Sequence, residues 1–469
     1  MSITYSNSFE AFIHETKNLL RLAVPIFIGQ LCTSCLGLID SIMSAAVGTV
    51  DLAAISLGAT FWMPTILFGI GVTTGLAPIV AQLNGSNNGH KIPAVVHNSL
   101  FPILVIIVLT SLFLAFAPKQ LLVFVTEEEL KAKTVDYLFY IALAAPAIIL
   151  FNVLKNTVEG LSIAVPSMVI GIATLILNIP INYIFIYGKF GMPAMGAVGC
   201  GLATAAVSWA ALFMMYGYCI FSKKLSNIRL WQKFYAFDKQ TIQHICAVGL
   251  PISIALIIET FSYAVLGYAI TPFGSKTVAA HQIANVTCIL VFMIPLSLAS
   301  AIAIRTSQSL GEGSKSRAKR AFFSGLSLGL IFILTTAVIV YINRFNIISV
   351  FTTDPEVIGI AAPLFIAILI YQFQDAFFGA TLGVVRGFKD TKFLMIVNII
   401  IMWGIGIPLG YLLGLTEYFG KCYGIYGMWG ILVVCYYLMT IAFSLRSWWL
   451  FKNVSLYLSL PVKNDLKKN

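Results

Sequence analysis

The chain has 469 residues, of which 59% are apolar and only 10% carry a charged side chain. Soluble domains carry about 25% charged residues. So few charges cannot cover the apolar surface of a chain of this length in water. The composition therefore excludes a soluble globular protein and predicts one whose solvent is lipid.

Apolar stretches of membrane-spanning length recur along the chain. They predict an all-α polytopic membrane protein with about twelve transmembrane helices, because barrel strands would alternate apolar and polar residues instead. The expected spans are 18–45, 51–82, 96–117, 134–156, 164–188, 196–221, 244–270, 279–304, 321–342, 357–382, 393–414 and 423–450.

The distribution of basic residues predicts the orientation. With the N-terminus inside, only seven of the 29 Lys and Arg residues lie in odd-numbered loops: Lys119, Lys131, Lys133, Lys189, Lys276, Arg344 and Lys421. Cytoplasmic loops carry the basic excess, so we expect a multi-pass inner-membrane protein with both termini in the cytoplasm. The net charge of +11 then reflects topology and contact with anionic membrane lipid. No basic stripe interleaved with exposed aromatic residues indicates nucleic acid.

The second half of the sequence repeats the first at an offset of 226 to 228 residues. Matched pairs include Pro25 with Pro251, Gly160 with Gly387, and Gly196 with Gly424. The repeat predicts two six-helix lobes, 1–221 and 244–469 with its cytoplasmic tail, joined by a cytoplasmic linker, 222–243. Because six is even, a pseudo-twofold axis along the membrane normal should relate the lobes, with a cleft near the midplane. This geometry suits alternating access, although repeats alone do not exclude a channel.

Three acidic residues lie well inside expected spans: Asp40, Glu259 and Asp375. An unpaired charge at that depth costs at least about 2.5–3.5 kcal/mol. The bases nearest in sequence fall at cytoplasmic helix ends: Lys155, Arg305 and Arg386. We therefore expect the carboxylates to bind a proton, a metal ion or an organic cation, rather than to form buried ion pairs.

The repeat separates these acids from the shared scaffold. Asp40 aligns with Leu266, Glu259 with Thr33, and Asp375 with Ile148. Each acid is therefore an addition specific to its own half, one in the first half and two in the second.

Polar and aromatic residues follow the acids at helical spacing. Tyr371 lies four residues before Asp375 and shares its face, with Phe378 beside them. Further polar positions are Gln282 and Asn285 in the second half, and Asn178, Asn182, Thr204 and Ser208 in the first. Hard oxygen ligands of this kind favour an alkali cation. Interhelical hydrogen bonding is the alternative for each amide or hydroxyl, and a proton would use the same acids.

Other chemistry has little support in the sequence. We find no P-loop for ATP and no H-E-x-x-H zinc motif. An intramembrane enzyme would need a nucleophile–base pair or a metal triad at depth, and we find neither. Cys32 and Cys35 lie within the first span and are interpreted as small packing residues. No cofactor is expected.

The segments LAVPIFIGQL, GLIDSIMSAAVG, PIVAQLNG, LNIPINYIFIYGKFG, GAVGCGLATA, TVAAHQIA, YQFQDAFFGA and VVRGFKD carry a family resemblance. The chain resembles the multidrug and toxic compound extrusion (MATE) family, in its bacterial NorM-type branch, over nearly its full length. The resemblance implies a C-lobe cation site formed by Glu259, Tyr371 and Asp375. It also implies an N-lobe cation, proton or substrate site formed by Asp40 with Asn178, Asn182 and Thr204.

The function expected from these observations is multidrug efflux by antiport. Hydrophobic or cationic organic compounds would leave in exchange for Na⁺ or H⁺, and the oxygen ligands Glu259, Tyr371 and Asp375 favour Na⁺ as the bound metal. Gln282, Asn285 and Phe378 are expected to line the cleft, and the protein is expected to be a monomer. The alternatives are a flippase for lipid-linked precursors, which would need basic groups in the cleft, and a cation channel.

Overall fold

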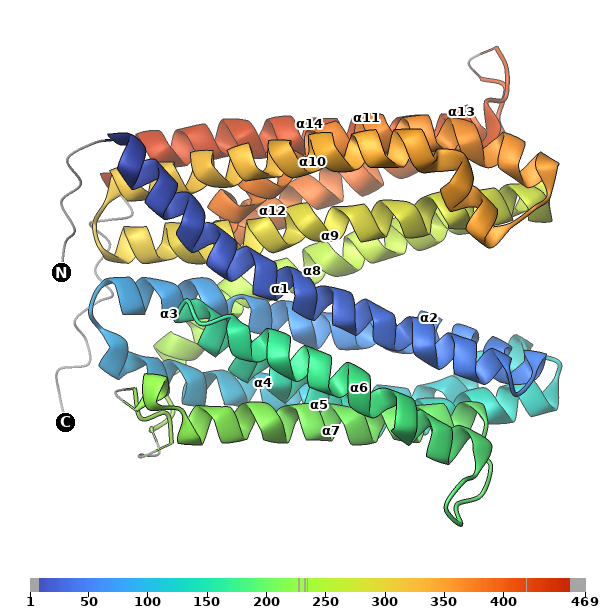
Figure 1. The fold of residues 1–469 in the computed structure, drawn as a ribbon, viewed down its shortest axis with the longest axis horizontal. Coiled ribbons are helices and arrows are strands. Elements are labelled where there is room, and N and C mark those ends of the chain that lie inside the picture. Colours follow the sequence, from blue (N-terminus) through green and yellow to red (C-terminus); the bar gives the residue numbers. More distant parts are fainter. Residues whose placement is uncertain (1–7, 227, 232, 234, 419, 456–469) are drawn as a thin grey trace. The chain divides into compact units, whose positions relative to one another are not determined.

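A computed structural model describes residues 8–226, 228–231, 233, 235–418 and 420–455, and all regular structure in this part is helical. Twelve helical segments are long and apolar enough to span a membrane, which confirms the expected fold class (Figure 1). The main helices are α1 (Ser8–Ala45), α2 (Thr49–Thr74), α3 (Leu76–Gly85), α4 (Ile92–Leu121), α5 (Glu128–Gly160), α6 (Val165–Tyr187), α7 (Ala197–Phe221), α8 (Lys239–Ala269), α9 (Ser275–Gly311), α10 (Lys315–Phe351), α11 (Pro355–Gly387), α12 (Thr391–Asn398), α13 (Ile407–Leu415) and α14 (Gly424–Lys452). Short 3₁₀ turns are η1 (Gly89–Lys91), η2 (Leu122–Phe124), η3 (Lys223–Leu225) and η4 (Thr271–Phe273).

Two of the expected continuous spans are interrupted, and a proline follows closely after each interruption. The span expected over 51–82 divides into α2 and α3 at Gly75, three residues before Pro78. The span expected over 393–414 divides into α12, the π-helix η5 (Ile399–Gly406) and α13, which has Pro408 in its first turn. Proline has no N–H to bond the carbonyl four residues earlier, so one bond of the regular ladder is missing at each of these positions.

Contacts group the described residues into two compact units. The N-terminal unit contains 24–84 and 88–254, and the C-terminal unit contains 8–23, 85–87 and 255–455. The divisions fall inside α1 and α8, so each of these helices has its first part in one unit and the remainder in the other.

The first part of α1 is fixed to the C-terminal unit by a buried ion pair. Glu15 is 2% exposed and accepts two hydrogen bonds from Arg305 of α9, from Nε at 2.6 Å and from an Nη at 2.7 Å. Gln308 accepts a third from the same guanidinium at 2.8 Å. Bidentate pairing of this kind fixes orientation as well as charge. Arg305 is therefore occupied by Glu15.

The first part of α8 packs closely within the N-terminal unit. The Ser253 hydroxyl donates to the Phe68 carbonyl of α2 at 2.7 Å. A Cβ at Gly249 would lie 2.5 Å from the Val72 carbonyl oxygen, so only glycine permits this approach. Small residues let helix backbones come together in membrane proteins, where the lipid supplies no hydrophobic driving force.

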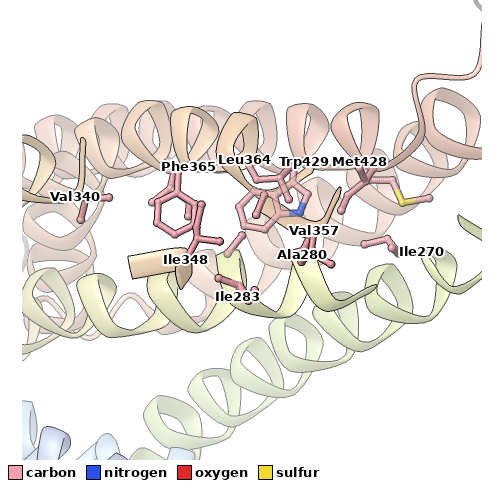
Figure 2. Packing of buried hydrophobic residues seen from close by; sticks show 14 residues of the cluster. Ile270, Ala280, Ile283, Val340, Ile348, Val357, Leu364, Phe365, Met428 and Trp429 are labelled. Carbon is pink, nitrogen blue, oxygen red and sulfur yellow. The ribbon is translucent and has the colours of Figure 1, made fainter. Parts of the chain in front are cut away.

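Each unit has its own apolar core. In the N-terminal unit Tyr137, Leu138 and Ile141 of α5 pack against α2 and α7. In the C-terminal unit Phe365 of α11 and Trp429 of α14 lie in a cluster that also draws on α9 and α10 (Figure 2). The helices of this second cluster, α9, α10, α11 and α14, form the frame that holds the C-lobe site.

The repeat found in the sequence is also visible in the backbone. Three pairs of aligned positions have left-handed backbone conformations at helix ends: Asn87 with Gly313, Ser162 with Lys389, and Gly196 with Gly424. Such conformations are uncommon for residues other than glycine. Their recurrence at the offsets 226, 227 and 228 indicates that the two halves fold in the same way.

A substitution on α11 tests the close packing of that helix. A Cβ at Gly383 would lie 2.7 Å from both the Ala299 carbonyl oxygen and the Ile302 Cβ of α9. We expect Gly383→Ala to destabilise the protein by about 1–3 kcal/mol, because an overpacked core must shift its backbone. Gly359→Ala on the same helix is the control, since nothing lies within 4 Å of its Cβ. Thermal unfolding of the purified protein in detergent measures both, and equal transition temperatures would contradict the packing.

Candidate functional site

The structure connects two of the three C-lobe residues predicted from the sequence, Glu259 and Tyr371, through a group of tyrosines. Tyr436 of α14 donates its hydroxyl to Glu259 Oε1 at 2.6 Å. The same hydroxyl lies 2.7 Å from that of Tyr263, which lies 3.4 Å from that of Tyr371. A chain of phenol groups therefore connects Glu259 on α8 with Tyr371 on α11. Sequence reasoning did not select Tyr436, which lies on the last helix and aligns with Ser208 in the repeat.

Asp375 is almost fully buried, with 1% of its surface exposed. Gln374 Nε2 donates to Asp375 Oδ1 at 2.7 Å, and Thr440 of α14 donates to Gln374 Oε1 at 2.5 Å. Asp375 Oδ2 is buried and has no hydrogen-bond partner. Asp375 and Glu259 also interact electrostatically. Because a buried carboxylate oxygen without a partner is costly, this oxygen is suited to receive a cation or a proton.

One basic residue requires a correction to the sequence analysis. Arg386, the penultimate residue of α11, is 9% exposed, and its Nε has no hydrogen-bond partner. It interacts electrostatically with Glu259, although no ion pair within 4 Å joins them in the described part of the chain. A position at a helix end suggested exposure to water, but the neighbouring helices cover this side chain. The acids are therefore not without a nearby positive charge, though neither acid is bonded to it.

The other residues expected around the C-lobe site have different surroundings. Phe378 is 3% exposed and packs its ring 5.7 Å from that of Tyr436. Gln282 is exposed and Asn285 half-buried, and neither forms a hydrogen bond with the carboxylates. An apolar groove of about 330 Å³ runs between α11 and α14, lined by residues that include Phe373, Phe377, Gln374, Tyr437 and Thr440.

The N-lobe site consists of one carboxylate surrounded by hydrogen-bond donors. Asp40 Oδ1 accepts from Asn182 Nδ2 at 2.6 Å and from Asn178 Nδ2 at 3.2 Å. Asp40 Oδ2 accepts from the Thr204 hydroxyl at 3.4 Å. All four predicted residues therefore meet, with Asp40 on α1, the two asparagines on α6 and Thr204 on α7. Hydrogen-bond donors therefore satisfy both oxygens of this carboxylate.

The described residues contain no group of three or more His, Cys, Asp or Glu side chains placed to hold a metal. His281 is engaged by Trp429, whose Nε1 lies 3.1 Å from His281 Nδ1. Cys32 and Cys35 are both free thiols. The polar chemistry of the interior is therefore that of carboxylate, phenol and amide oxygens, which suits a hard monovalent cation better than a transition metal.

Comparison with known proteins gives family and sequence matches over most of the chain. The MatE family model matches residues 25–184 and 251–412, once in each half. The chain is 39% identical to multidrug resistance protein NorM of Photobacterium profundum over 415 residues, which cover 88% of this chain and 91% of that protein. It is 38% identical to multidrug resistance protein MdtK of Yersinia pseudotuberculosis serotype O:1b over 450 residues, which cover 96% and 98%.

Solved structures share the fold at lower sequence identity. A MATE protein in the straight conformation gives a TM-score of 0.85 at 20% identity, covering 94% of this chain and 97% of that one. The eukaryotic MATE transporter AtDTX14 gives 0.83 at 19% identity, covering 96% and 98%. With two tandem matches to the family model and relatives aligned over most of their length, the chain belongs to the MATE family of membrane transporters.

Proposed function

We propose that the protein is a multidrug efflux antiporter that exports hydrophobic or cationic organic compounds in exchange for Na⁺ or H⁺. The observation that carries this proposal is a pair of carboxylates inside the apolar helices. Glu259 is half-buried and bonded to Tyr436, and Asp375 is 1% exposed with one oxygen that has no hydrogen-bond partner. Relatives named multidrug resistance proteins support the drug class. Asp375 Oδ2, buried and without a partner, is the atom best placed to receive the coupling cation.

The coupling cation would supply the energy for export. Each positive charge moving inward gains about 2.3 kcal/mol per 100 mV, and each tenfold gradient adds about 1.4 kcal/mol. Binding at Glu259 and Asp375 would favour the state that releases the drug, since a ligand shifts a conformational equilibrium only by its differential affinity. Glu259, Asp375 and the tyrosine oxygens favour Na⁺ over a transition metal.

Asp40 would provide the second cation, proton or substrate site. Its carboxylate receives donors from both asparagines and Thr204, and no basic side chain interacts with it among the described residues. A drug cation could therefore neutralise it directly. The basic loops place both termini in the cytoplasm of an inner-membrane protein, which we expect to function as a monomer in contact with lipid.

A flippase for lipid-linked precursors is the weaker interpretation. It would need several basic groups at depth to hold a pyrophosphate. Arg386 is buried in the C-terminal unit, and Lys389 follows it three residues later, just after the helix ends. Glu259 interacts electrostatically with Arg386, and a nearby carboxylate disfavours a pyrophosphate at this position.

Neutralising either C-lobe acid should abolish coupled efflux. We expect Glu259→Gln and Asp375→Asn to insert and fold but to lose cation-driven export of a cationic dye such as ethidium, because the amide no longer attracts the cation. The measurement is dye efflux from proteoliposomes under an imposed Na⁺ or H⁺ gradient. Glu417→Gln, an exposed acid in the loop before α14, is the control. Normal transport by Asp375→Asn would remove this site from the mechanism.

The identity of the coupling ion can be tested by withholding sodium. With the membrane potential held fixed, we expect efflux to rise with the inward Na⁺ gradient and to stop in sodium-free buffer, because the oxygen cluster suits an alkali cation. The initial rate of dye efflux from vesicles measures this dependence. Unchanged efflux without sodium, at constant proton gradient, would assign the coupling to protons instead.

Tyr436 is expected to support the charge on Glu259. A hydrogen bond to a charged group contributes about 1.5–3 kcal/mol, so Tyr436→Phe should weaken apparent cation affinity by about tenfold or more. Tyr437→Phe is the matched control, because that hydroxyl donates to the Ile370 backbone carbonyl at 3.0 Å. The cation concentration for half-maximal efflux measures both variants. Equal values for Tyr436→Phe and the unaltered protein would contradict the role.

A further inference from the structure

Gln372 is a buried polar residue that the proposed mechanism has not used. It lies on α11 with 1% of its surface exposed, and neither its Oε1 nor its Nε2 has a hydrogen-bond partner. Burying an amide without hydrogen bonds is costly, so such groups are few in folded proteins. A bound ion or water is a common reason for one that persists.

Gln372 shares a face of α11 with Asp375. The two residues are three positions apart, which places their Cβ atoms about 5–6 Å from each other on the helix surface. A helical side chain leans toward the N-terminus of its helix and lies over the residues three and four positions earlier. For Asp375 these residues are Gln372 and Tyr371. The carboxylate, the amide and the phenol are therefore neighbours on one surface.

The adjacent glutamine, Gln374, has a different environment because its amide is fully engaged. Its Nε2 donates to Asp375 Oδ1 at 2.7 Å, and its Oε1 accepts from Thr440 of α14 at 2.5 Å. These two bonds occupy one oxygen of the carboxylate. The other oxygen, Oδ2, is buried without a partner, and so are both polar atoms of Gln372. Unpartnered polar atoms of two side chains are thus gathered within one turn of α11.

The repeat shows that the scaffold does not require a polar residue at this position. Position 372 aligns with Ala145, at the offset of 227 that also aligns Gly160 with Gly387. Ala145 is 0% exposed and lies in the apolar core of the N-terminal unit. Gln372 is therefore specific to the half that carries two acids, as Asp375 is. Because an alanine fills the equivalent position, helix packing alone does not account for the glutamine.

We propose that Gln372 is a further ligand of the coupling cation, and that its amide oxygen binds Na⁺ together with Asp375 Oδ2. Carboxylate and carbonyl oxygens are the ligands that a hard cation prefers. Asp375 supplies the negative charge, and Gln372 supplies a neutral oxygen that raises the affinity without adding a second charge. This inference rests on the proposed cation site at Glu259 and Asp375 and names an additional ligand for it.

Replacing the amide by a thioether of similar size tests the proposal. In an Asp40→Asn background, which removes the N-lobe carboxylate, we expect Gln372→Met to weaken radioactive sodium binding to the purified protein by about tenfold. In sodium-free buffer this variant should unfold at the temperature of its parent or higher, because it removes a buried amide without partners. Sodium should raise that temperature less than it does in the parent. Gln120→Met, at an exposed glutamine of α4, is the control and should leave both measurements unchanged.

A second variant separates cation binding from packing. Gln372→Glu keeps a side-chain oxygen, so it should bind sodium at least as tightly as the parent, and it serves where Gln372→Met does not fold. Loss of sodium binding in folded Gln372→Glu would overturn the ligand. Unaltered affinity in folded Gln372→Met, with binding lost in Asp375→Asn, would also overturn the ligand and leave the site intact. Binding that persists in Asp375→Asn, or a parent that binds no sodium, would instead overturn the proposed sodium site itself.

Discussion

Carboxylates buried in a lipid-solvated helical protein impose the constraint on which this structure depends. Asp375 is 1% exposed and leaves one oxygen without a hydrogen-bond partner, although burial of a charge is favourable only when it is compensated. Gln374 and Thr440 satisfy one side of this group, and the tyrosine chain satisfies Glu259. One oxygen of Asp375 therefore remains uncompensated, and a bound cation or proton would compensate it.

The scaffold around these groups is duplicated, whereas the chemical groups are not. Aligned residues at helix ends, such as Gly196 and Gly424, have positive backbone φ angles in both halves. The acids and Arg386 occupy positions whose counterparts are apolar, neutral or of opposite charge. The two halves are thus similar helical frames that carry different charged side chains.

The twelve spans and the three acids could be predicted because both signals are local and strong. Long apolar runs cannot be compensated by neighbours, and an acid inside such a run stands out whatever it contacts. Tyr371 followed from its helical spacing to Asp375. Tyr436 did not, because its contact with Glu259 spans 177 residues and depends on how α14 packs against α8. Gln374 was missed because adjacent residues do not share a helix face, and Arg386 because position along a helix does not reveal what covers its end.

The two lobes compensate their carboxylates to different extents. Asp40 is compensated by dipoles alone, through two amides and a hydroxyl. In the other unit Tyr436 donates to Glu259, and Gln374 donates to one oxygen of Asp375, whose second oxygen has no partner. Both oxygens of Asp40 therefore receive hydrogen bonds, whereas Asp375 keeps one buried oxygen that a bound cation or proton would compensate.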